Sequence, residues 1–203
     1  MRIPRTVRVS VLALVLLIAR QAFAQEPERR GFIGLGIGPS TPVGTFAQSS
    51  WTNLGDGRTA SGYTDTFVNI GYRLREHLGV AGAFSYSEYT MSGGGDDDWY
   101  QVAGLTAGPM YSIRLNARAA LDLKAMAGLI AMTPVVDSYE TLDKTGGGLG
   151  LDLRAAIRYD VLRRWAVFAE VGVQAANVSF DSGARTDYRA LTSGFGVAFR
   201  PAW

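Results

Sequence analysis

The chain has 203 residues, with 20 lysines and arginines against 18 aspartates and glutamates, and this length suits one domain. It contains no cysteine, which excludes a disulfide framework and a lipoprotein acylation site. After the first 24 residues, no stretch is apolar and long enough for a spanning helix, so a membrane role would require a β-barrel.

The first 24 residues have the organisation of a secretory signal peptide. Three arginines open the chain, an apolar run follows at 11–19, and residues 22–24 form an A-x-A cleavage pattern. A membrane-anchoring helix is the alternative, but the run is shorter than the about 20 residues that such a helix needs. We expect cleavage between Ala24 and Gln25, which leaves residues 25–203 as one domain.

Removing this leader changes the charge balance. The leader holds four arginines and no acidic residue, so the mature chain has an excess of two acidic residues. The high sequence pI is therefore mostly due to the leader. A nucleic-acid-binding domain needs a basic surface, and the mature chain gives no support for one.

Alternation of apolar with polar or small residues predicts eight strands, because successive side chains of a strand point to opposite faces. In chain order the predicted strands are 31–38, 63–74, 78–91, 99–114, 119–133, 148–160, 165–177 and 187–203. Glycines alternate with large residues in the first, whose spacing is not that of a phosphate-binding loop. We expect Pro39 to end that strand, and Pro109 to introduce a bulge into the fourth.

The sixth predicted strand, 148–160, has the clearest alternation. One face is aliphatic up to Tyr159, and the other carries Asp152, Arg154, Arg158 and small residues. A helix is the alternative reading, because several of its apolar residues also share a helical face. The run is close to the 9–11 residues that a tilted strand needs to cross a bilayer.

The connections between the predicted strands alternate between long and short along the chain. This arrangement puts the tight turns at one end and the long loops at the other, as in a bacterial outer-membrane barrel. Aromatic residues near the strand ends predict two interfacial belts. The belt residues are Tyr72, Trp99, Tyr111, Tyr159, Trp165, Phe199 and Trp203, and we add Tyr89, Tyr100, Phe180 and Tyr188 on the long-loop side.

The segments GFIGLGIGPSTPVGTFA, TDTFVNIGYRL and GPMYSI resemble the outer-membrane protein β-barrel domain family, which consists of porin-like small barrels. The resemblance covers essentially the whole mature chain. It implies an all-β fold, an eight-stranded antiparallel up-and-down transmembrane β-barrel of the OmpA or OmpX type. It also implies location in the bacterial outer membrane and insertion by the barrel-assembly machinery. The family usually ends in phenylalanine, where this chain has Trp203.

An eight-stranded barrel has an interior that side chains can fill. The inward register predicts a charge network there, formed by Asp65, Arg73, Arg114, Asp122, Lys124, Asp152, Arg154, Arg158, Glu170 and Arg200. These charges should pair or meet water, since an unpaired buried ion costs several kcal/mol. We expect a plug of paired charges, and a narrow channel for ions or small solutes is the alternative.

Two other features suggest chemistry only weakly. Asp96, Asp97 and Asp98 follow three glycines, but they lack the ligand spacing of a calcium loop, so we expect a solvated loop tip. The single histidine, His77, lies in a short turn, away from the loop side where barrel enzymes act. We therefore expect no enzyme activity, no metal and no cofactor.

The sequence favours an integral outer-membrane protein with a structural or surface-interaction role through its loops. We expect a monomer that contacts outer-membrane lipid and no nucleic acid, with a loop-side partner that the sequence does not identify. A soluble lipocalin-like barrel is a further alternative, but it would leave a very large apolar surface in water.

Overall fold

The computed structural model describes residues 30–48, 58–59, 62–92, 99–135, 145–181 and 183–201. The elements are β1 (Gly31–Pro42), the short helix α2 (Thr45–Gln48), β2 (Arg58–Thr59), β3 (Gly62–Arg73), β4 (Leu78–Ser92), β5 (Trp99–Arg114), β6 (Ala119–Val135), β7 (Gly146–Leu162), β8 (Trp165–Ser179) and β9 (Arg185–Phe199). In this part of the chain no helix has the length and hydrophobicity that crossing a membrane requires.

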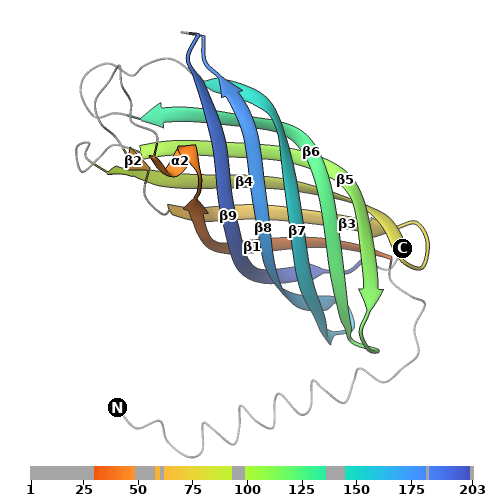
Figure 1. Cartoon of the computed structure of the whole chain (residues 1–203). Helices are drawn as coiled ribbons and strands as arrows, with labels where there is room; N and C mark the ends of the chain where they lie inside the picture. Colours follow the sequence, from red (N-terminus) through yellow and green to blue (C-terminus); the bar gives the residue numbers. More distant parts are fainter. Residues whose placement is uncertain are drawn as a thin grey trace, which may run out of the picture.

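Eight long strands form a closed antiparallel ring (Figure 1). Each strand pairs with its neighbours along the chain, β1 pairs with β9, and the pairing of β4 with β5 completes the circle. The small strand β2 pairs only with the loop end of β4. The predicted all-β, eight-stranded fold is confirmed, and the segment 148–160 lies within strand β7 rather than in a helix.

The two faces of the wall follow the predicted alternation. Aliphatic and aromatic side chains such as Leu149, Leu105 and Phe195 point outward and are 79%, 65% and 68% exposed. Inward positions of the same strands are buried, as the alternating burial along β6, β7 and β8 shows. The barrel thus has an apolar outside and a polar, packed inside, which suits lipid around it and not water.

Glycines on the inner face of the wall make room for aromatic rings. A Cβ at Gly36 would collide with the ring of Phe67, and a Cβ at Gly71 would collide with the ring of Phe32. These glycines of β1 and β3 therefore have a packing cause. Each ring lies against a bare stretch of wall and fills the interior.

The two predictions about prolines are wrong. Strand β1 continues past Pro39 to Pro42, because the residues of β1 before and after Pro39 keep their pairing with β3 and β9. Pro109 pairs with Val80, and the register of β5 on β6 resumes unchanged at Met110. One missing donor does not displace a strand that is held on both sides along its length. The register shifts occur elsewhere, between Gly36 and Gly38, Thr64 and Thr66, and Asp160 and Leu162.

Candidate functional site

The centre of the barrel interior is an ion cluster around Glu170. Strand pairing places Lys124 of β6 directly opposite Arg154 of β7, so two cations lie side by side. Glu170 of β8 accepts from both, with 2.5 Å from Lys124 Nζ to Oε2 and 2.8 Å from Arg154 Nη1 to Oε1. Asn69 donates to the same carboxylate and accepts from Lys124. Glu170 therefore offsets the repulsion between its two cationic neighbours.

Asp152 is the second anion of this cluster. Its two carboxylate oxygens accept from Nε and Nη2 of Arg154, both at 2.7 Å. Thr106 and Gln174 also donate to Asp152, at 3.2 and 3.1 Å. The side chain of Arg154 thus bridges Asp152 and Glu170, and every charge in the cluster has an opposite charge beside it.

A second pair lies nearer the turn end of the barrel. Asp122 accepts from Ser112 at 2.6 Å and forms an ion pair with Arg158 at 3.4 Å. The ring of Phe32 lies against this region, with the Arg158 guanidinium 4.6 Å and the Lys124 ammonium 5.9 Å from its centre. The aromatic face adds a cation–π contribution to the stability of the two cations.

An aromatic cluster fills the loop end of the interior. Phe46 of helix α2 is fully buried, and its ring lies 5.3, 5.9 and 5.1 Å from the rings of Tyr89, Tyr100 and Tyr188. Gly44, with a φ of 65°, turns the chain from β1 into the barrel mouth just before this helix. We call these four aromatic residues the aromatic cap. It lies over the ion cluster on the loop side.

Hydrogen bonds connect the aromatic cap to the ion cluster. The Tyr89 hydroxyl contacts Ser40 at 2.6 Å and the Tyr188 hydroxyl at 3.0 Å. Tyr188 donates to Oε1 of Gln174 at 3.1 Å, and Gln174 in turn donates to Asp152. The aromatic cap and the ion cluster are therefore joined by hydrogen bonds into one network.

The structure brings together most of the residues predicted for the interior network. The six residues Asp122, Lys124, Asp152, Arg154, Arg158 and Glu170 are buried and share ion pairs. Arg73 is also buried, and Arg200 forms an ion pair with Asp160 near the turn end. The side chain of Asp65 lies outside the described part of the structure.

Arg114 is exposed, so its predicted burial in the interior is wrong. Its position has the inward alternation, but β5 ends at this residue and its side chain is exposed. Beyond the last strand residue the wall no longer encloses the side chain. The sequence pattern marks the face of a residue but not its depth along the barrel.

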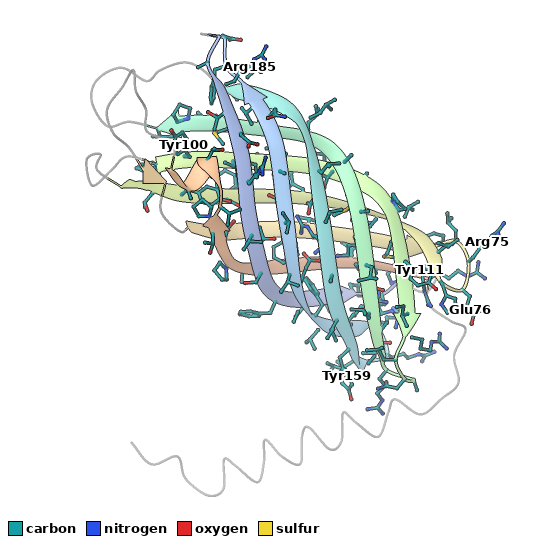
Figure 2. The ribbon with its side chains drawn as sticks, in the orientation of Figure 1. Arg75, Glu76, Tyr100, Tyr111, Tyr159 and Arg185 are labelled. Atoms are coloured by element: carbon teal, nitrogen blue, oxygen red, sulfur yellow. The ribbon has the colours of Figure 1, made fainter. Side chains whose placement is uncertain are left out.

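The aromatic residues of the turn end lie on the outer face of the barrel, where an interfacial belt is expected. Tyr111, Tyr159 and Trp165 are 44%, 44% and 48% exposed, and Trp165 packs edge-on against Phe199 at 5.3 Å. Tyr72 is partly exposed on the same outer face. Figure 2 shows Tyr111 and Tyr159 at the end of the barrel that also carries Arg75 and Glu76.

The expected belt at the loop end is wrong for four residues. Tyr89, Tyr100 and Tyr188 are buried because they occupy inward positions of their strands, and Phe180, which directly follows β8, is buried in the same cluster. Trp99 has the outward alternation and is partly exposed. Trp203, the signal peptide 1–24 and the triad Asp96, Asp97 and Asp98 lie outside the described residues.

Sequence reasoning missed four neutral members of the network and one acidic residue. Asn69, Gln174, Thr106 and Ser112 donate to the buried carboxylates, and Asp160 is the acidic partner of Arg200. All of them share the inward alternation of the charged residues. That alternation was the available signal, but the prediction left out the neutral residues and Asp160.

The arrangement leaves little space for a solute in the cluster. A cavity of about 10 Å³ lies beside Arg154, Glu170 and Gln174, which is about the space for one water molecule. In the described residues no group of acidic, histidine or cysteine side chains is arranged to hold a metal. His77 contacts the backbone oxygen of Ser112 at 3.1 Å in its turn.

Comparisons with known proteins agree with this architecture. A sequence model described as the outer membrane protein beta-barrel domain matches residues 10–200. Among curated proteins, none matches the sequence significantly.

Solved structures with a similar fold include Neisserial surface protein A, with 16% identity, a TM-score of 0.57, and 84% of this chain and 97% of that chain covered. OprG of Pseudomonas aeruginosa has 12% identity, a TM-score of 0.53, and 87% and 99% coverage. Ail, the attachment invasion locus protein of Yersinia pestis, solved with a heparin analogue, has 15% identity, a TM-score of 0.50, and 85% and 99% coverage. At these identities the likeness shows the fold alone.

Proposed function

Because the chain belongs to the outer membrane protein beta-barrel domain family, it is an integral outer membrane protein, and we propose that its barrel is closed by its own side chains and acts through its loops. The role is structural or surface-interactive rather than catalytic. The barrel wall anchors the chain in the bacterial outer membrane and holds the long loops at the cell surface.

The observation that carries this proposal is that Arg154 forms ion pairs with two carboxylates at once. Its guanidinium bridges Asp152 and Glu170 in the middle of the interior, and its side chain is 3% exposed. An ion that passed this point would have to break a pair that the low-dielectric interior strengthens. The aromatic cap lies over the same position and adds a second layer.

The absence of a catalytic role is part of the proposal. Each carboxylate of the cluster already accepts from at least one cation, which leaves none poised as a general base. His77 is engaged with the Ser112 backbone and lies 3.8 Å from Glu76 on the turn side. A nucleophile–base pair requires both groups within hydrogen-bond reach of each other and of a substrate.

Single-channel recording in planar bilayers tests the closed barrel. We expect no steady conductance from the purified, folded protein, whereas a 16-stranded porin in the same bilayers should conduct. Stable, ion-selective channels that Arg154→Ala alters would show that the interior is a conduit. The protein would then be a narrow channel, and the plug would be wrong.

A further inference from the structure

The connections at the two ends of the barrel carry opposite charge. At the loop end, residues 43–61, 93–98, 136–145 and 180–184 carry eight acidic residues and two basic ones; they are Asp56, Asp96, Asp97, Asp98, Asp137, Glu140, Asp143 and Asp181, with Arg58 and Lys144. At the turn end, the connections carry Arg75, Arg118, Arg163 and Arg164 with Glu76 as the acidic residue. The turn end is therefore basic, although the mature chain as a whole is not.

The basic charge lies beside an apolar groove on the outside of the wall. The groove has a volume of about 750 Å³ and crosses the neighbouring strands β7, β8, β9 and β1. It is lined by the small residues Gly36, Ala169 and Gly196 and by the larger Tyr159, Val167 and Phe195. On the outer face, the small side chain of Ala169 leaves space between these larger residues, and the inward-facing Gly36 and Gly196 contribute only backbone to the groove.

The strands that line this groove end in arginines on the turn side. Arg163 and Arg164 form the exposed turn between β7 and β8, and Arg30 is exposed just before β1. Val167 lies three residues after Arg164, which is about 10 Å along a strand. Tyr159 lines the turn-side part of the groove, and Trp165 follows the arginines on the outer face. Both lie at the height expected for a headgroup boundary.

We propose that this groove and the Arg163–Arg164 turn form a binding site for one anionic phospholipid of the leaflet that borders the turns. An acyl chain lies in the groove, and the headgroup phosphate contacts the two guanidinium groups. Arginine suits this role because its planar fork can donate two hydrogen bonds to a phosphate. The inference rests on the proposed function in that it requires the barrel to span the membrane.

Charge complementarity selects this occupant over others. A second copy of this chain would bring Arg163 and Arg164 against the same arginines, and like charges at an interface are unfavourable. Lipid A would have to bind at the other, acidic end, because it occupies the opposite leaflet. A zwitterionic phospholipid would fill the groove but would gain less from the arginines.

Native mass spectrometry of the detergent-folded full chain tests the site, with phosphatidylglycerol as the probe. We expect one retained phosphatidylglycerol per protein, and at least about tenfold weaker retention of phosphatidylcholine at equal concentration. The double variant Arg163→Gln/Arg164→Gln should retain phosphatidylglycerol about tenfold more weakly than the parent. Ala169→Trp should also lose phosphatidylglycerol, because the tryptophan side chain fills the groove. Lipid A and the fraction of dimer are measured in the same spectra.

Matched controls lie across the ring. Arg75→Gln removes a charge from the turn between β3 and β4, and Ala107→Trp adds the same bulk to the outer face of β5. Both should retain the lipid. The proposal would be overturned if both phospholipids were retained equally or if the controls lost as much lipid as the site variants. Preferred binding of lipid A, or a dimer in place of a lipid adduct, would also overturn it. A closed barrel without bound lipid would refute only this site, and a conducting barrel with bound lipid would refute only the plug.

Discussion

Arg154 and Asp152 occupy alternate positions of one strand, and their side chains meet through two hydrogen bonds of 2.7 Å each. Two residues apart is the spacing at which side chains of a strand share a face, so the pair is local in sequence. The same guanidinium also reaches Glu170 on the neighbouring strand β8. One arginine thus ties together a strand and its neighbour inside the barrel.

Arg154→Ala should lower the free energy of unfolding by about 3–5 kcal/mol, because it leaves buried carboxylates without their cation. Urea titration of the barrel refolded in detergent micelles measures this change. Arg75→Ala, at an exposed turn, is the control and should change stability by about 0.5 kcal/mol or less. Equal effects of the two variants would mean that the interior network is not buried.

Glu170→Gln should also destabilise the barrel, because the pairing of β6 with β7 holds Lys124 directly opposite Arg154. Without the carboxylate, the two cations repel each other in a dry interior. Adding Lys124→Met removes one of them, so the double variant should be more stable than the two single changes predict by about 0.5–3 kcal/mol. Additive effects in the same urea titration would rule out this coupling.

Val171→Arg tests which face meets lipid. Val171 is 59% exposed near the middle of β8, and an arginine at mid-bilayer depth should cost about 2–4 kcal/mol. Asn177→Arg, on the same outer face near the loop end, should cost about 0–1 kcal/mol. Folding in lipid vesicles, followed by urea titration, compares the two, and a Val171→Arg barrel as stable as the parent would reverse the assigned faces.

Phe46→Ala should lower the free energy of unfolding by about 3–5 kcal/mol, because it leaves a cavity among the rings of the aromatic cap. Phe195→Ala, on the outer face at 68% exposure, should cost less. The Phe46→Ala barrel should still show no steady conductance in planar bilayers, because the ion cluster below the cap is intact. If this variant conducts ions and the parent does not, then the aromatic cap, and not the ion cluster, closes the barrel to ions.

The mature protein should begin at Gln25, because Ala22 and Ala24 flank a short apolar run that suits signal peptidase. Mass spectrometry of the envelope fraction measures the N-terminal residue directly. A replacement of Ala24 by a bulky tyrosine should slow the cleavage and leave residues 1–24 attached. An intact leader on the unaltered envelope protein would contradict the prediction.

The number of long strands, the facing of most wall residues and the two kinds of barrel end were predictable from the sequence. Each depends on local information: alternation with a period of two assigns a face, and the length of a connection assigns an end. Asp152 and Arg154 were assignable to the interior in this way. Pro39 and Pro109 did not predict where a strand ends or bulges, because pairing with the neighbouring strands keeps the strand regular through a proline.

The tertiary structure alone decided which charges meet and where the interior is aromatic. Lys124 reaches Glu170 across an intervening strand, and Tyr89 reaches Tyr188 from the other side of the ring. Such contacts depend on closure of the barrel and on register shifts such as the one between Gly36 and Gly38, which no local pattern encodes. Phe46 lies in a loop segment without alternation, so its burial follows only from the turn at Gly44 and the space that the closed wall leaves for its ring.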